Sequence, residues 1–261
     1  MDKLFDIIHE DAELLVINKQ ADLVCHPTKG DEYSSLISRV RLYLGADSKP
    51  HLVNRLDRET SGVTLVAKSA AVAGELGRLW ETRVVEKEYI AIVHGHVREK
   101  HGLIDAPLGK DEQSIVAIKD CVRADGAASQ TEFWVERRFE RNAPLTPTLS
   151  PSDGEREGDA ARELKFTLLR LLPRTGRKHQ IRIHLAHLGH PIVGDKIYGG
   201  DVDLYLALVE GRLTDEQRAR LILPNHALHA SALRFEWRGQ PVEFRCEPER
   251  WFRDFISTAE L

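Results

Sequence analysis

The sequence predicts an α+β fold with a mixed, largely antiparallel sheet. Segments typical of strands dominate, helices are scattered between them, and no internal repeat is visible. The composition, 42% hydrophobic and 30% charged, is ordinary for a globular protein, and 261 residues are enough to bury a sizeable core. We therefore expect a single domain over residues 1–261.

The strands are predicted from alternating apolar residues and from short apolar runs between turn signals. The first two flank an acidic turn, and Gly62 opens the third. In the fourth, Tyr89 falls on one face and Ile90 on the other. In chain order, the predicted strands cover residues 4–11, 14–17, 63–67, 87–94, 131–138, 164–172 and 228–237.

The helices are predicted from apolar residues at helical spacing between capping signals. In the first, Ser34 or Ser35 serves as the N-cap and Gly45 ends the helix, and Ser69 caps the second. In the third, apolar residues follow the i, i+4, i+7 rule and should face the core. The predicted helices cover residues 34–44, 69–81, 179–188, 203–220 and 252–255.

Residues 141–162 differ in composition from the strands around them. The segment holds three prolines, followed by a run of Glu, Arg, Gly and Asp. Such a composition cannot build a packed core. We expect a flexible insertion between two strands.

Charge and cysteine content exclude several classes of protein. The net charge of −4 argues mildly against a protein that coats nucleic acid by charge alone, although a local basic cleft remains compatible with it. Cys25, Cys121 and Cys246 lie far apart, so a reducing compartment is expected rather than a disulfide framework. No secretory signal is visible, and no apolar run approaches the roughly 20 residues of a membrane span. We expect a cytoplasmic protein that does not enter membranes.

The segment Arg55-Leu56-Asp57-Arg58 sets one carboxylate between two guanidinium groups, in a loop that leads through Gly62 into a strand. A nearby arginine favours the charged form of Asp57. An ionised, oriented aspartate suits nucleophilic or proton-abstracting chemistry. The alternative is a surface ion pair in a turn, which contributes little.

A second basic segment, residues 173–182, forms a turn at a helix start with four Arg or Lys residues. Free backbone N–H groups and cations at such a place suit phosphate. Arg182 follows the core-facing Ile181, so it should emerge beside the core and could reach a carboxylate from another element. The alternative is a solvated basic turn.

Tyr89 shares a strand face with Ala91 and Val93. A tyrosine at the edge of a cleft can stack on an unstacked base, and the alternative is a core tyrosine.

Four histidines, His179, His184, His187 and His190, fall within twelve residues and raise the question of a metal site. His184 and His187 share a helix face, but no acidic residue joins them as in H-E-x-x-H. We expect no metal.

Five segments together resemble the RluA-type family of RNA pseudouridine synthases, over about residues 5 to 245. Each is modest alone, but their order makes the resemblance specific. They are Arg55-Leu56-Asp57-Arg58-Glu59-Thr60-Ser61-Gly62, Lys87-Glu88-Tyr89-Ile90-Ala91-Ile92-Val93-His94-Gly95, Thr175-Gly176-Arg177-Lys178-His179-Gln180-Ile181-Arg182-Ile183-His184-Leu185, His190-Pro191-Ile192-Val193-Gly194-Asp195-Lys196-Ile197-Tyr198-Gly199 and Leu228-His229-Ala230.

The resemblance implies the pseudouridine synthase fold, with a curved central sheet, helices outside it and a cleft across its middle. It implies that Asp57 is the catalytic aspartate, that Arg182 pairs with it, and that Tyr89 stacks on the target uracil. Arg55 would enter the space that the flipped base leaves. The implied partner is structured ribosomal or transfer RNA, with no small-molecule cofactor, and we expect a monomer.

Two features depart from the family pattern. The family usually has His directly before Arg-Leu-Asp, whereas this chain has Asn54, which could alter substrate contacts. Many relatives carry an S4 RNA-binding domain ahead of the catalytic domain, and this chain begins at the catalytic domain. RNA would then be bound by the cleft itself or by accessory loops, and residues 141–162 could serve as a clamp.

The implied reaction breaks the glycosidic bond of a uridine, turns the uracil and rejoins it through carbon 5. Asp57 either attacks the anomeric carbon or removes the 2′ proton of the sugar, and the sequence does not choose between these routes. One alternative is a catalytically silent RNA-binding protein on the same fold. Another is a hydrolase that cleaves a glycosidic bond with Asp57 and Glu59 as paired carboxylates. Two carboxylates that are two residues apart in one loop are poorly placed to flank such a bond.

Overall fold

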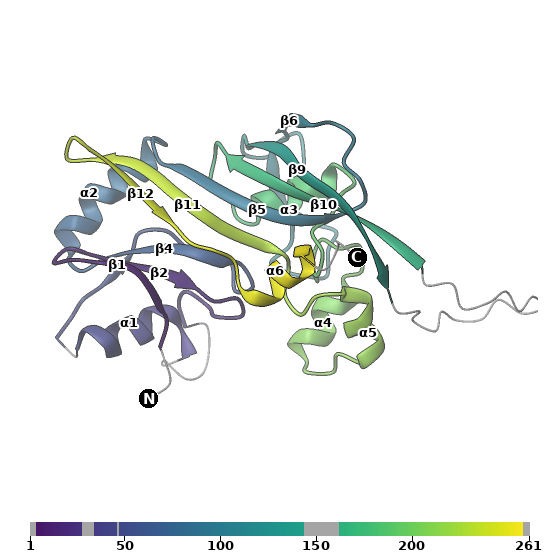
Figure 1. The fold of residues 1–261 in the computed structure, drawn as a ribbon. Coiled ribbons are helices and arrows are strands. Elements are labelled where there is room, and N and C mark those ends of the chain that lie inside the picture. The colour runs from purple at the N-terminus through teal and green to yellow at the C-terminus, as the bar shows by residue number, and fades with distance from the viewer. Residues whose placement is uncertain (1–3, 28–33, 46, 144–161, 258–261) are drawn as a thin grey trace, which may run out of the picture.

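The computed structural model describes residues 4–27, 34–45, 47–143 and 162–257 (Figure 1). Its main feature is a ten-stranded sheet. The strands are β1 (Asp6–Glu10), β2 (Leu14–Lys19), β3 (His51–Leu52), β4 (Ser61–Ala67), β5 (Glu86–His94), β6 (His101–Asp105), β9 (Gln130–Ala143), β10 (Arg162–Pro173), β11 (Leu228–Trp237) and β12 (Gln240–Arg245).

The strands follow the order β1-β2-β4-β11-β5-β10-β9-β6, with β3 beside β4 and β12 beside β11. β4 and β11 run parallel, and the other pairs among the described residues are antiparallel. A separate hairpin joins β7 (Leu108–Lys110) to β8 (Asp120–Val122). The predicted α+β class with a mixed, mostly antiparallel sheet is therefore confirmed.

Six helices flank the sheets in the described part of the chain (Figure 1). They are α1 (Leu36–Leu44), α2 (Ala70–Glu81), α3 (Gln180–His187), α4 (Asp203–Val209), α5 (Asp215–Leu221) and α6 (Arg250–Ser257). The Ser35 and Ser69 hydroxyls accept backbone N–H groups in the first turns of α1 and α2, as N-caps do. None of the described helices is long and apolar enough to cross a membrane.

Successive side chains of β2 feed two separate cores. Leu15 and Ile17 pack with α1, whereas Leu14 and Val16 pack with α2. Because neighbouring strand residues point to opposite faces, both faces of this part of the sheet are covered, and every residue of β4 is buried. A third and larger core joins β5, β10, α3 and α6.

The middle of the sheet brings distant motifs together at Ala230 on β11. Ala230 pairs with Gly62 of β4 on one side and with Tyr89 of β5 on the other. A Cβ atom on Gly62 would lie 2.3 Å from the carbonyl oxygen of Ala230, and its φ is +119°. Only glycine fits this close approach. Gly62 therefore lets the loop that precedes β4 lie next to Tyr89.

The helix predicted over 203–220 is wrong in its middle, where the chain forms two short helices instead. Gly211 adopts a left-handed φ of +68° after α4. Thr214 then starts α5 with a capping box, in which its hydroxyl accepts from Gln217 and the Gln217 side chain accepts from its N–H. Both signals are visible in the sequence, but the polar composition masked them.

The insertion predicted over 141–162 begins later and ends earlier than expected. β9 extends to Ala143 and β10 starts at Arg162, and these two residues pair with each other. The remainder of the predicted insertion, 144–161, lies outside the described residues.

Candidate active site

Asp57 lies in the loop between β3 and β4, and buried groups bond to the backbone of this loop. Leu56 is buried, and the Cys25 thiol contacts both the N–H and the carbonyl of Leu56. The ammonium group of Lys19, fully buried, donates to the carbonyl oxygen of Arg58 at 2.9 Å and to two other carbonyls. Three carbonyl acceptors satisfy all three donors of this lysine.

The residues after Asp57 are fixed by side chains from the other half of the chain. Each of three consecutive positions has a buried partner. Glu59 Oε1 accepts from Lys196 Nζ at 2.8 Å, Thr60 Oγ1 contacts His226 Nε2 at 2.7 Å, and Ser61 Oγ contacts His229 Nδ1 at 2.9 Å. Buried contacts at three consecutive positions thus fix the loop that carries Asp57.

Arg182, on α3, lies between two carboxylates. Its Nη1 donates to Asp57 Oδ2 at 2.9 Å, while Nε and Nη2 donate to Asp195 Oδ2 and Oδ1 at 2.7 and 2.9 Å. Asp195 is fully buried and also accepts the backbone N–H groups of Ile197 and Tyr198. The contact expected between Arg182 and Asp57 is present.

Charges around Asp57 keep it ionised. Burial raises the pKa of this carboxyl, but the positive charge and the hydrogen bond of Arg182 act against burial, and the pKa lies below its usual value. The side chain of Asp57 is 29% exposed, so it can be reached from the pocket while Arg182 stays covered.

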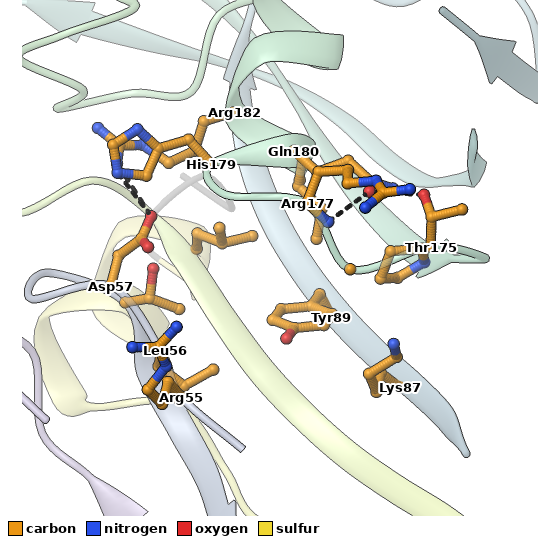
Figure 2. A pocket seen from close by; sticks show the side chains of 15 residues that line it. Arg55, Leu56, Asp57, Lys87, Tyr89, Thr175, Arg177, His179, Gln180 and Arg182 are labelled. Atoms are coloured by element: carbon orange, nitrogen blue, oxygen red, sulfur yellow. Dashed lines mark hydrogen bonds and ion pairs between the residues drawn. The ribbon is translucent and has the colours of Figure 1, made fainter. Parts of the chain in front are cut away.

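All four residues predicted for the site, Arg55, Asp57, Tyr89 and Arg182, line one pocket (Figure 2). Arg55 is exposed at the pocket and Tyr89 is half-buried on β5. The other lining residues come from the Asp57 loop, from β5, the end of β10 and β11, and from the turn before α3 and the first turn of that helix. They are Leu56, Thr60, Lys87, Pro173, Thr175, Gly176, Arg177, His179, Gln180, Ile181 and Leu228.

Gln180 fixes the pocket wall formed by the turn before α3. Its Oε1 accepts from the Thr175 hydroxyl at 2.6 Å and from the Arg177 N–H at 3.0 Å. Its Nε2 donates to the Gln130 carbonyl and to the Thr131 hydroxyl on β9. The buried amide therefore ties the turn to the sheet. Its oxygen accepts two hydrogen bonds and its nitrogen donates two, so all of its donors and acceptors are satisfied.

The basic turn expected to bind phosphate is less available than predicted. Three of its four cations face carboxylates. The pairs are Arg174 with Glu132, Lys178 with Asp120 at 2.9 Å, and Arg182 with Asp57 and Asp195. Arg177 keeps only a 3.5 Å contact with a carbonyl, and Lys87 makes no ion pair among the described residues. Arg177 and Lys87 are thus the cations of this pocket wall that remain open to an anion.

Asn54, which replaces the usual histidine, bonds to the sheet. Its Nδ2 donates to the Val63 carbonyl and its Oδ1 accepts the Leu65 N–H. The side chain thus bonds to the backbone of β4. It does not line the pocket. Asn54 therefore attaches the loop to β4, and Asp57 still lines the pocket.

The clustered histidines have separate surroundings. The ring of His184 lies between the Thr131 hydroxyl and the Ala106 carbonyl, and His190 contacts the His94 carbonyl. Among the described residues, no group of three or more His, Cys, Asp or Glu side chains is arranged to hold a metal ion.

Sequence reasoning missed several residues that hold the site. Asp195 and Lys196 stand in a quoted motif, yet their partners, Arg182 and Glu59, lie in other motifs. Nothing in one sequence states which distant charges meet. A Lys or Asp inside an otherwise apolar stretch is the available signal, since such residues are seldom buried unless paired.

The pocket thus combines a buried arginine, the ionised aspartate that it bonds and a tyrosine ring, as the motifs predict. A family model described as RNA pseudouridylate synthase matches residues 13–187. The chain belongs to this family, as its motifs predict.

Relatives and solved structures agree with the family. The chain is 34% identical to "Dual-specificity RNA pseudouridine synthase RluA" of Vibrio parahaemolyticus, over 97% of this chain and 89% of the relative. It is 32% identical to an "Uncharacterized RNA pseudouridine synthase" of Aquifex aeolicus, over 74% of this chain but only 56% of the relative. The chain thus spans little more than half the length of that relative. The structure of "Human RNA Pseudouridylate Synthase Domain Containing 1" matches with a TM-score of 0.67 and 26% identity, over 95% of this chain and 86% of that one.

Proposed function

We propose that this chain is an RNA pseudouridine synthase that isomerises specific uridines in ribosomal or transfer RNA through Asp57. The observation that carries the proposal is the 2.9 Å bond from Arg182 to Asp57 in a pocket that Tyr89 also lines. Relatives named as a dual-specificity RNA enzyme, a "Ribosomal large subunit pseudouridine synthase D" and a "tRNA pseudouridine synthase C" support both classes of RNA.

The target base must leave its stack before its glycosidic bond can be rearranged. This step costs a few kcal/mol. Tyr89 offers a ring face in the pocket for the extruded uracil, and the exposed Arg55 could enter the vacated space. Arg177 and Lys87 suit the phosphates of the same nucleotide strand.

Asp57 then acts on the sugar as an ionised carboxylate. It either attacks carbon 1′ or removes the 2′ proton, and in both cases the bond from carbon 1′ to nitrogen 1 breaks. The uracil turns and carbon 5 bonds to carbon 1′, while the bond from Asp57 to carbon 1′ breaks in the first route or Asp57 returns the proton to carbon 2′ in the second. Carbon 5 then loses its proton while nitrogen 1 gains one. Atoms and charge balance without an outside reactant, so the reaction is an isomerisation.

Residues 1–261 are proposed to act as one catalytic domain and as a monomer. The continuous sheet from β1 to β6 supports a single domain. Light scattering of the purified protein would measure the monomer directly. The cytoplasmic location stays a prediction from the sequence.

The two alternatives make different products. A silent RNA-binding protein would leave uridine unchanged, and a glycoside hydrolase would release free uracil. The hydrolase needs Glu59 beside Asp57, but the Glu59 carboxylate is bonded to Lys196 and to the His226 N–H. This disfavours the hydrolase.

The experiment uses purified protein and total RNA from cells that lack the gene. Carbodiimide-blocked primer extension and nucleoside chromatography should detect new pseudouridine at one or a few positions. RNA that binds without modification would support the silent alternative, and free uracil would support the hydrolase.

A further inference from the structure

His179 has an unusual backbone conformation beside Asp57. It is the N-cap of α3 with φ +54° and ψ 15°, in the left-handed region that few non-glycine residues adopt. Such conformations cluster at functional sites. The ring lies next to Asp57, with Nε2 3.9 Å from Oδ2 (Figure 2). That separation is too long for a hydrogen bond, so this nitrogen lies beside Asp57 without a hydrogen-bond partner among the described residues.

The other ring nitrogen of His179 is held by Tyr198. Nδ1 lies 2.9 Å from the Tyr198 hydroxyl, and this oxygen also accepts the backbone N–H of Asp120 at 3.2 Å. A phenol has one proton to donate, and Nδ1 is its nearest acceptor in the part of the chain that the structure describes. The Tyr198 O–H therefore donates to Nδ1, which leaves the histidine proton on Nε2.

The Asp57 carboxylate and the lowered pKa of His179 both agree with this tautomer. An unprotonated Nε2 would direct a lone pair at the carboxylate of Asp57, whereas an N–H is attracted to it. Burial lowers the pKa of His179, and Arg182 and Lys178 add to this, although Asp57 and Asp195 act in the opposite direction. The imidazole is thus a neutral donor.

We infer that His179 is a further catalytic residue, whose Nε2–H donates a hydrogen bond to the 2′-hydroxyl oxygen of the target nucleotide. The inference rests on the proposed function, because it concerns the same site. Asp57 must reach carbon 1′ or the 2′ proton, so the adjacent 2′-oxygen lies beside Asp57 in either route. An Nε2–H at 3.9 Å from Asp57 Oδ2 is placed to reach it.

The other oxygens of the nucleotide fit less well. The ring oxygen loses electron density when the glycosidic bond breaks, which makes it a poor acceptor. Phosphate oxygens have cations available at Arg177 and Lys87. The 2′-hydroxyl is also the group that distinguishes RNA from DNA. A donor fixed by Tyr198 would therefore add to the preference of this site for ribonucleotides, since a site built to bond a hydroxyl rejects the analogue without it.

The tautomer can be tested without RNA. Long-range ¹H–¹⁵N spectra of ¹⁵N-histidine-labelled protein at pH 7 should show His179 as the neutral Nε2–H form. The signal is assigned by its loss in His179→Asn, because asparagine tolerates a left-handed backbone. Tyr198→Phe should yield a mixture of tautomers, while Tyr43→Phe, which removes a remote hydroxyl bond to Glu10, should leave the signal unchanged. The neutral Nδ1–H form in the wild type would overturn the inference, because its Nε2 has no proton to donate.

The contact to the sugar is tested with RNA that carries the mapped uridine. Two quantities are measured for each protein. The first is the inhibition constant of an RNA with 2′-deoxyuridine at that position, and the second is the concentration of all-ribose RNA that half-saturates the single-turnover rate. The first is divided by the second, so a high ratio means that the site prefers the ribonucleotide. This ratio should fall by roughly tenfold in His179→Asn, the effect expected for one lost hydrogen bond, and by less in Tyr198→Phe, where part of the protein keeps the Nε2–H tautomer. It should not change in Tyr43→Phe. An unchanged ratio in His179→Asn would refute the contact. A lower rate with an unchanged ratio in Tyr198→Phe would mean that Tyr198 is merely structural.

The two failures are separable. If no RNA is modified, the proposed function fails, while the spectra still decide the state of His179. If RNA is modified but the ratio does not respond, only the role of His179 is lost.

Discussion

Asp195 accepts two hydrogen bonds from the guanidinium group of Arg182, and this leaves the Nη1 edge of Arg182 for Asp57. The fork geometry of such a pair fixes the plane of the guanidinium. Two carboxylates around one arginine carry a net charge of −1. Asp57 is therefore held in its ionised form without being fully neutralised, which suits a group that has to react.

Replacing Arg182 with lysine tests this geometry. Lysine keeps the charge, but a single ammonium cannot make the fork to Asp195 and also reach Asp57. We expect Arg182→Lys to lower the single-turnover rate by at least roughly 100-fold, and Arg182→Ala to lower it further, because Asp57 then lacks its partner. Rates within a few-fold of the wild type would refute the role of this pairing.

Replacing Asp195 with asparagine tests the buried ion pair between Asp195 and Arg182. The change leaves a buried guanidinium with one carboxylate fewer, so the free energy of unfolding in urea should fall by about 3–5 kcal/mol. Asp125→Asn is the matched control, because Asp125 makes a similar fork with Arg123 at 2.6 and 2.8 Å on the surface. Its urea midpoint should stay near that of the wild type. Equal effects of the two variants would contradict this account.

Gly62→Ala tests the close approach of β4 to β11. The added Cβ would meet the Ala230 carbonyl at 2.3 Å, so the strands must separate, and we expect a loss of roughly 3 kcal/mol in thermal unfolding. Gly74→Ala in α2 is the control. A Cβ there meets nothing within 4 Å, and alanine should stabilise the helix by up to about 1 kcal/mol. If Gly62→Ala behaved like Gly74→Ala, the register of β4 and β11 would be wrong.

The stability of the protein should fall with acid before its carboxylates titrate. Burial lowers the pKa of His226 to about 3 and that of His229 to about 4, whereas both are near 6.5 in the unfolded chain. Between pH 6.5 and about 4 the unfolded chain therefore binds more protons than the folded one, and the free energy of unfolding decreases as the pH falls. Urea titrations at pH 7.5, 6 and 5 would measure this. Equal stability at pH 7.5 and 5 would show that these histidines are not buried neutral.

The sequence predicted the elements whose signals are local. Ser69 with the spacing behind it was enough for α2, and the alternation around Tyr89 was enough for β5. It missed β6 and β12, which extend the sheet beside β9 and β11. β6 depends on a partner far away in the chain, so its own composition predicts it poorly. β12 instead follows β11 after a two-residue turn, Arg238-Gly239, and the sequence interpretation did not use this turn as a hairpin signal.

The candidate site divides in the same way. Asp57, Tyr89, Arg182 and Arg55 were predicted because they stand in ordered motifs, and all four line one pocket. Asp195 and His179 stood in the same motifs without an expected role, since a positioning contact depends on which residues from different motifs meet after folding. Asp195 meets Arg182, thirteen residues away, only because the chain between them turns back on α3.

The most direct test of the central claim is pseudouridine mapping in cells that lack this gene and carry either the wild-type chain or Asp57→Asn. The account predicts that one or a few pseudouridines disappear on deletion and return only with the wild type. Purified Asp57→Asn should keep its melting temperature and much of its RNA affinity while turnover falls by roughly 10⁴-fold or more. Restoration of the same pseudouridines by Asp57→Asn would contradict the account.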